Sequence, residues 1–496
     1  MKELSTQIYD VAVFGAGISG FSSALRLQKK GLSTIVFESH TQVGGCAGYF
    51  IKKKFSFDVG ATTLVDFVEG GVGGNFLKEI GLAIPEGEYL DYIAWLPDRQ
   101  VVLYKDKEKW NRERLEKFGK SDNYIQFWKL MDRVTDVFWE ASRKNIKLPI
   151  RNINEFLHTI QVIGLKNLHF LKYYNTTMLD ILKKFNLEKD KALIGLLSML
   201  IEDTIHSKIE KAPFINSSLG TTIRGAGLMR ARGGMKGFWK NLSEHYLNLG
   251  GIVKKLHKVT SFCKEGDCWK ITTDRGNFFA KKIISSLPLD VTYDLAPDFI
   301  QTKVKPYILK NKEDRGGAIV IFLGVPEEEV RDHTITHHQM LLDYDAELGN
   351  GNNMFISISS KDDNLSAPPG YRSVMISTHC ELSDWQGLSE EEYRVKKQQI
   401  GDTMIHYARR VYPKLATNPV VLEVGTPITY QKFTNRKEGS VGGFKQTFAN
   451  TNFHAVPQDI GIPNFYLTGD NTWPGLGTVA CLVSGRIAAE EAYKAF

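Results

Sequence analysis

The most constraining feature of the sequence is a glycine pattern, Gly15-x-Gly17-x-x-Gly20, that directly follows an expected strand, Tyr9–Phe14. An expected helix comes next, with apolar residues at helical spacing. In such a turn the first glycine permits the sharp bend and the second admits a pyrophosphate to the backbone N–H groups. The third glycine lets helix and strand pack closely. The pattern predicts a βαβ unit that binds a dinucleotide.

An acidic residue at the end of the next expected strand supports this prediction. The strand, Ser33–Phe37, ends at Glu38, whose carboxylate is placed to accept hydrogen bonds from the hydroxyls of an adenosine ribose. The positive end of the first helix would then face the phosphates. An ordinary glycine-rich turn explains the glycines but leaves Glu38 without a role.

Length and composition limit the class of protein. A chain of 496 residues suggests two or three structural units at about 150 residues each. With 42% apolar and 24% charged residues it is neither disordered nor collagen-like, and no apolar run approaches the roughly 18–20 residues that span a bilayer. The net charge of +7 is too diffuse to predict nucleic-acid binding. The segment Met1–Asp10 lacks a secretory pattern, so we expect a cytoplasmic protein, with the inner face of a membrane as a second expected location.

A second glycine turn lies shortly after Glu38. Gly44-Gly45-Cys46-Ala47-Gly48 would let the backbone wrap a cofactor again, and Phe55–Gly60 reads as another strand that feeds a turn. A nicotinamide dinucleotide does not need this second turn. The pattern resembles that of the large flavoprotein family of amine oxidases and carotenoid desaturases, in which such a turn follows the ribose-binding acid, and this resemblance implies a flavin dinucleotide.

The other end of the chain repeats the strand, turn and helix pattern. An expected strand, Asn464–Thr468, leads into Gly469 and Asp470, and an expected helix runs from Val479 to Tyr493. Asp470 would hold a ribityl hydroxyl or one on the pyrophosphate side. The N-terminus of this helix would point at the pyrimidine ring of the flavin and favour its reduced, negatively charged form.

These motifs resemble those of the carotenoid (phytoene-type) desaturases, the carotenoid isomerases and the retinol saturases, and most of all bacterial carotenoid 3′,4′-desaturases. The resemblance is carried by Gly44–Gly48, Phe57–Thr62, Thr426–Arg436 with Gly442-Gly443, and Gly469–Thr478. It implies FAD as the cofactor, and it implies that the backbone near Val259 touches the adenine. The family's usual arginine after the glycine pair is Cys46 here, so any contact from that arginine is absent.

The motifs and the resemblance together indicate these cofactor-binding residues: Gly15, Ala16, Gly17, Ile18, Ser19, Gly20, Glu38, Ser39, Gly44, Gly45, Cys46, Ala47, Gly60, Ala61, Thr62, Val259, Gly469, Asp470, Gly477, Thr478, Val479 and Ala480.

The expected fold is α/β, with a discontinuous Rossmann-like FAD-binding domain, a mixed-sheet substrate domain and a helical cap. The FAD-binding domain would comprise residues 1–70, 231–290 and 426–496. The substrate domain would comprise 71–230, which includes the cap, and the sheet and helices of 291–425. Within the middle part, Ile252–Phe262, Trp269–Thr273 and Phe278–Leu287 are expected to form a β-meander.

The segment Leu115–Asp203 shows helical apolar spacing and forms the expected cap. Within it, Phe156–Tyr174 is denser in apolar residues and carries Lys166 and Lys172. An apolar helix with interleaved lysines suits docking on an anionic bilayer, from which a polyene could enter. A cap helix packed on the core explains the same pattern and is the commoner case.

The resemblance implies hydride transfer from a saturated carbon of a polyene to flavin N5, with an apolar tunnel supplied by the protein. No general base can be named from the sequence. Trp95 and, more convincingly, Trp473 are expected to line the site, whereas His333, His337 and His338 are expected to be surface residues without a metal. Because no second Gly-x-Gly-x-x-Gly occurs, oxygen or a membrane quinone is the expected electron acceptor.

Three other functions remain open at this stage. A carotenoid cis–trans isomerase or a retinol-saturase-like enzyme would share all the motifs. An amine or amino-acid oxidase would share the fold but needs an aromatic cage or an arginine clamp, which we do not identify. A lipid-binding escort on the same fold would need neither Glu38 nor Asp470.

Overall fold

A computed structural model describes residues 7–222, 227–494 and 496. Most of Met1–Asp10, the segment inspected for a secretory signal, therefore lies outside the described residues. Within these ranges no helix combines the length and the apolar character needed to cross a bilayer.

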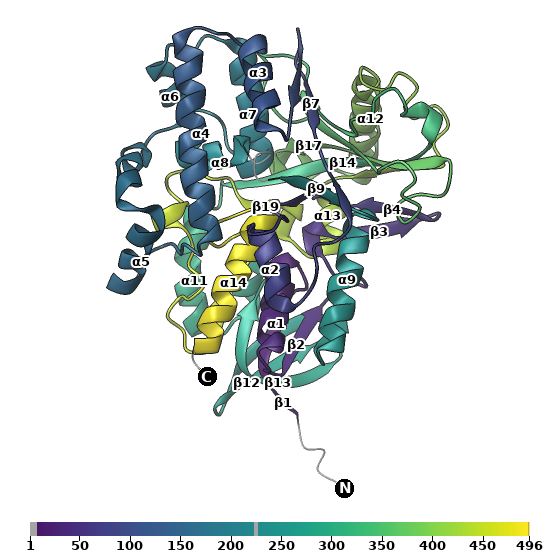
Figure 1. Cartoon of the computed structure of the whole chain (residues 1–496). Helices are drawn as coiled ribbons and strands as arrows, with labels where there is room; N and C mark the ends of the chain where they lie inside the picture. Colours follow the sequence, from purple (N-terminus) through teal and green to yellow (C-terminus); the bar gives the residue numbers. More distant parts are fainter. Residues whose placement is uncertain (1–6, 223–226, 495) are drawn as a thin grey trace.

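The first sheet collects its strands from three distant parts of the chain (Figure 1). The strands β10, β2, β1, β13 and β20 pair in parallel, whereas β11 and β12 extend the sheet as an antiparallel ladder from β13. Their bounds are β1 (Ile8–Phe14), β2 (Thr34–Glu38), β10 (Ile252–Lys255), β11 (Val259–Glu265), β12 (Cys268–Thr273), β13 (Gly276–Ser285) and β20 (Phe465–Leu467). This sheet confirms the expected discontinuous Rossmann-like fold.

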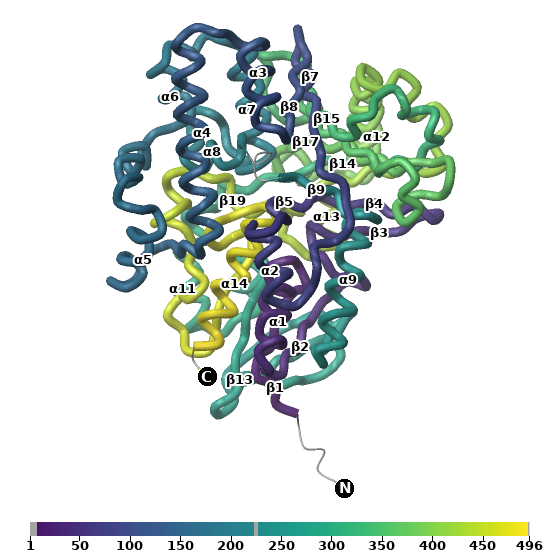
Figure 2. Tube along the Cα trace, in the orientation of Figure 1, coloured from purple at the N-terminus to yellow at the C-terminus, as the bar shows by residue number. Residues whose placement is uncertain are grey.

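Helices from both ends of the chain pack side by side on this sheet (Figure 2). Ser23 Oγ on the first helix donates a hydrogen bond to the Gly485 carbonyl on the last, at 2.9 Å. A Cβ added at Gly485 would lie 2.4 Å from Ser22 Oγ, so a glycine is needed at this crossing. The helices around this sheet are α1 (Ile18–Lys29), α2 (Val72–Ile80), α9 (Gly234–Asn248), α10 (Leu289–Leu295), α11 (Asp298–Lys310) and α14 (Thr478–Lys494).

A second, mixed sheet forms the other half of the molecule. Its order is β18-β14-β17-β16-β15-β7-β8, with β19 paired to β14. The bounds are β7 (Tyr92–Trp95), β8 (Gln100–Leu103), β14 (Arg315–Pro326), β15 (His337–Leu341), β16 (Asn353–Ile358), β17 (Tyr371–Cys380), β18 (Val421–Gly425) and β19 (Val441–Phe444). Helix α12 (Glu390–Ala408) contributes Met404 and Ile405 to the apolar core with one face of this sheet.

Small ladders and one short helix join the two sheets. The hairpin pairs β3 (Tyr49–Lys52) with β4 (Phe55–Asp58), and β9 (Leu228–Ala231) lies between β5 (Leu64–Val65) and β6 (Gly87–Tyr89). Helix α13 (Pro427–Thr434) follows β18 and leads into β19. The chain therefore passes between the sheets close to the glycine turns.

The expected cap is a layer of helices with its own apolar core, which includes Leu193, Leu197 and Phe127. Its elements are α3 (Lys107–Lys117), α4 (Asp122–Arg143), α5 (Ile153–Ile163), the 3₁₀ segment η2 (Leu165–Tyr173), α6 (Met178–Lys184), α7 (Lys191–Ile205) and α8 (Phe214–Thr221). The core stripes that the sequence suggested on α4 and α7 are buried.

One expected strand is wrong. Ile252–Phe262 is not continuous, because the chain turns at Leu256, whose φ is 55°. The first piece, β10, pairs with β2, and the second, β11, pairs with β12. The domain limits stay a proposal. The expected FAD-binding segment 231–290 would leave most of α10 and all of α11 outside the FAD-binding domain. Both helices nevertheless pack against its sheet, because Leu289 and Ile300 share an apolar core with Phe262 of β11.

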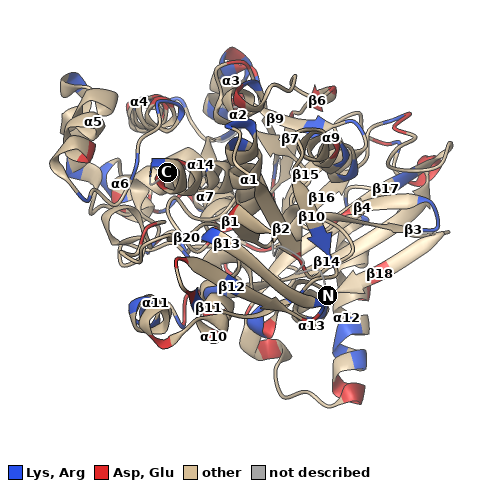
Figure 3. Cartoon of the chain, turned by 90° about the horizontal axis from the view of Figure 1, so that it is seen from below, with Lys and Arg blue, Asp and Glu red and all other residues tan. Residues whose placement is uncertain are grey.

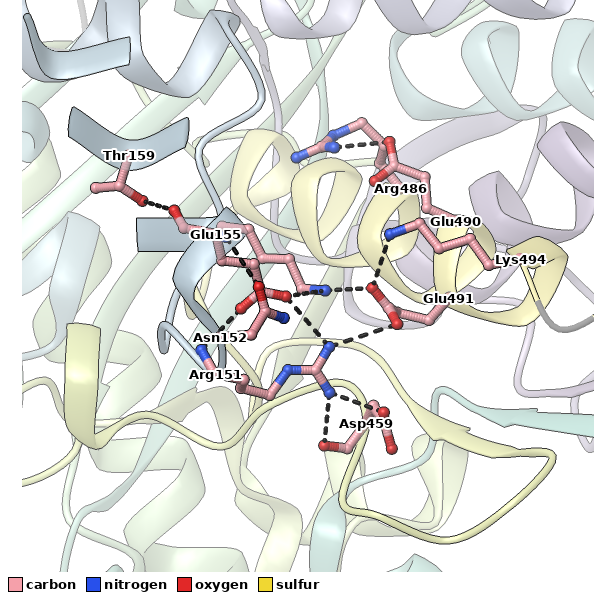
Figure 4. Close-up of polar contacts among 10 residues, drawn as sticks. Arg151, Asn152, Glu155, Thr159, Asp459, Arg486, Glu490, Glu491 and Lys494 are labelled. Atoms are coloured by element: carbon pink, nitrogen blue, oxygen red, sulfur yellow. Dashed lines mark hydrogen bonds and ion pairs between the residues drawn. The ribbon is translucent and has the colours of Figure 1, made fainter. Parts of the chain in front are cut away.

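A cluster of ion pairs joins the cap to the last helix (Figure 4). Lys147 bonds to Glu155 at the start of α5 and to Glu491 of α14. Arg151 lies 3.4 Å from Glu491 and 2.8 Å from Asp459. All five side chains are at most 30% exposed, so the cluster fixes the base of α5 against the FAD-side helices.

The charges in this cluster lower two carboxyl pKa values. Burial raises the pKa of Glu491, but the hydrogen bond and charge of Lys147 outweigh it and the net pKa falls. Burial also raises the pKa of Glu155, but the hydrogen bond from the Arg151 backbone N–H and the interaction with Lys147 outweigh it, so that the net pKa falls. A lowered folded-state pKa stabilises the protein above the unfolded value of about 4.3, and the stabilisation is lost as pH falls through the folded value.

We therefore expect Glu491→Gln to lower the melting temperature at pH 7, because it removes charged hydrogen bonds that contribute about 1.5–3 kcal/mol. The deficit should shrink below about pH 4. Thermal melting of the wild type and of Glu491→Gln from pH 7 to pH 3 measures this deficit in melting temperature. The control is Glu490→Gln, because Glu490 is 37% exposed and pairs only with Arg486 in this region. A deficit that is the same at every pH, or an equal deficit in the control, would contradict the expectation.

Candidate functional site

The Gly15–Gly20 turn has the geometry that its sequence suggests. Gly15 has a φ of 88°, and its N–H donates to the Phe37 carbonyl at 2.8 Å. A Cβ added at Gly20 would lie 2.5 Å from the Gly15 carbonyl oxygen and 2.7 Å from Ser286 Cβ. The third glycine is therefore required for α1 to pack against the ends of β1 and β13.

The first turn of α1 is open to an anion. Ile18 and Ser19 lie in this turn, the N-cap is Gly17, and no side chain caps the helix or places an acid in its first turn. A Cβ added at Gly17 would meet only Ser286 Oγ, at 3.9 Å, among the described residues. Free N–H groups at a helix N-terminus bind phosphate readily. The space and the donors fit a pyrophosphate.

Glu38 is held at the end of β2 by the first glycine turn. Its Oε2 accepts the Ala16 N–H at 2.9 Å, and its Oε1 accepts the His40 N–H at 2.8 Å. The residue is 9% exposed. Ser39 Oγ also donates to Oε1, at 3.4 Å, so Oε2 is the oxygen that keeps a lone pair and can still accept a hydrogen bond from a ribose hydroxyl.

The second glycine turn lies directly against the first. Gly44 pairs with Gly17 in a short backbone bridge, and its N–H donates to the Ala16 carbonyl at 2.9 Å. Gly45, Cys46 and Ala47 then form one 3₁₀ turn. A Cβ added at Gly60 would lie 2.4 Å from the Cys46 carbonyl oxygen, so the Gly60 segment adjoins this turn.

The segment Gly60, Ala61 and Thr62 is fixed by a buried ion pair. Arg230 Nη1 donates to Asp58 Oδ2 at 2.6 Å, and both side chains are at most 4% exposed. The Met235 N–H also donates to Asp58, at 2.8 Å. The pair thereby ties β4 and the following residues to β9 and α9.

The C-terminal motif meets the N-terminal one. A Cβ added at Gly469 would lie 3.5 Å from Ser19 Oγ of α1. Asp470 forms an ion pair with Arg436 at 2.6 Å. After Gly477, where an added Cβ would meet nothing within 4 Å among the described residues, Thr478, Val479 and Ala480 form the first turn of α14. The glycine turns and both helix N-termini thus lie at one edge of the first sheet.

Two further predicted residues can be placed. Val259 begins β11, and two residues before it the His257 N–H donates to the Glu38 carbonyl at 3.0 Å. Trp473 is 7% exposed and belongs to the apolar core around α1 and α14. The adenine contact of Val259 and the substrate contact of Trp473 stay predictions.

The expectations for Trp95, His337 and His338 are wrong, whereas His333 is half-buried in the loop before β15. His337 and His338 are fully buried in β15. Trp95 Nε1 lies 3.2 Å from His338 Nδ1, in the core between the second sheet and α12, away from the glycine turns. Burial lowers the pKa of His338 to about 3, so it is neutral. The sequence pattern of these histidines gives no sign that other elements cover both faces of β15, which is why their burial was not predicted.

A polar group that the sequence did not reveal lies between α7 and β17. His379 Nδ1 is 3.8 Å from Glu202 Oε2, and the His206 ring centroid is 4.3 Å from that of His379. Burial lowers the pKa of His379, but the hydrogen bond and charge of Glu202 raise it overall, whereas burial lowers that of His206. His379 also lines a pocket with Met199, Phe355 and Ser377.

This group adjoins the cofactor edge through a pair of glycines. A Cβ added at Gly442 would lie 2.3 Å from His206 Cε1, and one added at Gly443 would lie 2.2 Å from the Asp470 carbonyl oxygen. His206 and Asp470 therefore lie on neighbouring sides of the same two-residue segment. The described residues contain no group of three or more His, Cys, Asp or Glu arranged to hold a metal ion.

Comparisons with known proteins agree with this architecture. Residues 18–492 match the model of a family described as flavin containing amine oxidoreductase. The chain is 27% identical to the chloroplastic prolycopene isomerase of Daucus carota, over 97% of this chain and 79% of that protein. It is 22% identical to a 4,4′-diapophytoene desaturase of Staphylococcus aureus, over 98% of each. A solved putrescine oxidase double mutant superposes with a TM-score of 0.62 at 15% identity, covering 99% of each chain.

We expect Glu38→Ala to abolish stoichiometric binding of FAD. The change removes the predicted ribose acceptor and also frees the Ala16 N–H, which it holds at 2.9 Å. The visible absorption spectrum of the purified protein, and of the cofactor released on denaturation, measures the occupancy. Glu79→Ala, which removes a partner of Arg26 on the far side of α1, is the control. Full flavin bands in folded Glu38→Ala would contradict the assignment.

Proposed function

The chain belongs to the flavin containing amine oxidoreductase family and is an FAD-dependent oxidoreductase; on that premise we propose that it desaturates a carotenoid or a related isoprenoid polyene. The observation that carries the proposal is the nearly full-length similarity to a diapophytoene desaturase and to a prolycopene isomerase. The cofactor edge described above supports it. The expected FAD contacts of individual residues are part of the proposal.

Bound FAD supplies the acceptor for a hydride taken from a saturated carbon. The chain's own task is to hold the cofactor and to align the polyene beside it. The helix N-termini of α1 and α14 offer positive ends toward the phosphates and the flavin ring.

Desaturation also removes a proton from the neighbouring carbon, and this proton needs an acceptor. We assign that role to His379, because Glu202 lies 3.8 Å from it and its ring lies 4.3 Å from that of His206, which packs against Gly442 at the cofactor edge. The base must be neutral, so turnover should rise with pH through the raised pKa of His379.

Alternative functions differ in their products. A cis–trans isomerase or a retinol-saturase-like enzyme would use the same cofactor edge, and the similarity to prolycopene isomerase favours the isomerase among them. An amine or amino-acid oxidase remains the alternative that the fold allows, and a lipid escort would bind no FAD. The finer resemblance to bacterial carotenoid 3′,4′-desaturases, and oxygen or a quinone as electron acceptor, stay predictions. So does the absence of metal and nucleic-acid partners.

We also propose that the cap docks on the inner face of an anionic membrane. On α5 and η2, Ile153, Leu157 and Leu165 are 66%, 57% and 76% exposed, which departs from a helix packed on the core. Lys166 and Lys172 are exposed on the same segment. Apolar side chains with interleaved lysines match the chemistry of an anionic lipid surface. Elsewhere, Lys and Arg are scattered among Asp and Glu (Figure 3).

The function is tested by incubating the FAD-loaded protein with a phytoene-type carotene in liposomes, with oxygen or a quinone. We expect a product that has lost pairs of hydrogens, seen by mass spectrometry. His379→Gln should keep the flavin spectrum but lower turnover at least about tenfold and lose the rise of activity with pH. His333→Gln, which changes a half-buried histidine in the loop before β15, is the control. An isomer of unchanged mass would indicate the isomerase, and release of peroxide from an amine would indicate the oxidase.

Membrane docking is tested by sedimentation with vesicles of phosphatidylglycerol and phosphatidylcholine. The triple variant Ile153→Ser, Leu157→Ser, Leu165→Ser should bind at least about tenfold more weakly, since burial of even one such side chain contributes about 1.5–3 kcal/mol. Leu247→Ser, at a 54% exposed residue of α9, is the matched control. Equal binding of all three proteins, or no binding of the wild type, would contradict the proposal.

A further inference from the structure

The second glycine turn lacks the cation that the family resemblance leads one to expect, because Cys46 stands in that position. A guanidinium nevertheless lies nearby, from a distant part of the chain. Arg436 follows α13, and its charge and that of Asp470 both act on the Cys46 thiol, whose pKa is raised first of all by burial. Tyr430 of α13 also packs in the apolar cluster that Cys46 joins.

Arg436 lies between two predicted ends of the cofactor. On one side, Asn435 Nδ2 donates to Ser39 Oγ at 3.1 Å, next to the predicted ribose acid Glu38. On the other side, Arg436 Nη2 donates to Asp470 Oδ2 at 2.6 Å. In FAD the pyrophosphate is the group that joins the adenosine ribose to the ribityl chain. The neighbouring residues Asn435 and Arg436 thus reach from the predicted ribose end to the predicted ribityl end, along which a pyrophosphate would lie.

The guanidinium has donors to spare. The Arg436 side chain is 13% exposed and that of Asp470 is 15% exposed. Its hydrogen bond to Asp470 is its only one among the described residues. An arginine carries five N–H donors in a planar fork that matches two phosphate oxygens. The Arg436 nitrogens without a partner are not among the fully buried unpaired atoms of the described residues, so they are accessible and can donate to an anionic group bound beside them.

We propose that Arg436 binds the pyrophosphate of FAD and takes the place of the arginine that Cys46 replaces. The pairing with Asp470 orients the guanidinium, as a carboxylate orients an arginine in a bidentate contact. Arg436 is thus a residue that positions the cofactor and takes no part in the chemistry. The inference rests on the FAD site of the proposed function.

The test is to titrate the apoprotein with three probes, namely FAD, ADP-ribose and riboflavin. ADP-ribose contains the pyrophosphate without the flavin, and riboflavin contains the flavin without any phosphate. We expect Arg436→Gln to weaken binding of FAD and of ADP-ribose about 10- to 100-fold, which corresponds to one charged hydrogen-bonded contact. Binding of riboflavin should change less than about threefold. Arg436→Lys should recover part of the loss.

The matched control is Arg486→Gln. Arg486 is 12% exposed and pairs with one carboxylate, Glu490, two turns into α14. It should leave all three affinities unchanged. Circular dichroism and melting temperature establish that each variant is folded. Because Arg436→Gln leaves Asp470 unpaired, the variant Arg436→Gln with Cys46→Arg serves as a rescue, and it should regain ADP-ribose affinity.

Three outcomes would overturn the inference. Unchanged ADP-ribose affinity in folded Arg436→Gln would show that Arg436 does not touch the pyrophosphate. A loss confined to riboflavin and FAD would place it at the flavin instead. A rescue variant no better than Arg436→Gln would refute the exchange with position 46. Failure of the wild type to bind FAD would refute the proposed function itself, which separates the two failures.

Discussion

The close packing of the first helix on the last is the constraint on which the rest of the structure depends. Ser23 of α1 bonds to the Gly485 carbonyl of α14, and the absence of a side chain at Gly485 allows the approach. This contact joins segments more than 460 residues apart. It brings two helix N-termini to one edge of the first sheet, where two positive helix ends can face one extended cofactor.

The remainder of the molecule is built around that edge. The buried Arg230–Asp58 pair holds the strand that leads to Gly60, and α13 delivers Arg436 beside Asp470. On the opposite side, the cap and the second sheet enclose His379 and Glu202. The ion pairs of Lys147 and Arg151 with Glu491 of α14 hold the cap against the cofactor side of the molecule. In the proposed function, the first sheet with its helices binds the cofactor, and the cap with the second sheet receives the substrate. Helix α14 contacts both parts.

The local motifs were predictable because each is carried by neighbouring residues. The strand, glycine turn and acid around Gly15 and Glu38 follow from steric rules of a few residues, and so does the turn after Asp470. The histidines of β15 were misjudged for the opposite reason. His338 is buried because β7 and α12, which are distant in the sequence, pack around it. The polarity of its sequence neighbours does not indicate this packing.

The sequence by itself determined the dinucleotide-binding unit and the helical character of the cap, because hydrophobic period and glycine placement are local properties, and the discontinuous α/β fold followed from the family resemblance. Only the tertiary structure decided which distant side chains meet. It put Arg436 between Ser39 and Asp470, brought His206 and His379 together, and left Ile153 and Leu157 exposed. Such contacts arise when whole layers pack together. The residues that a side chain meets across a layer produce no periodic pattern in the sequence.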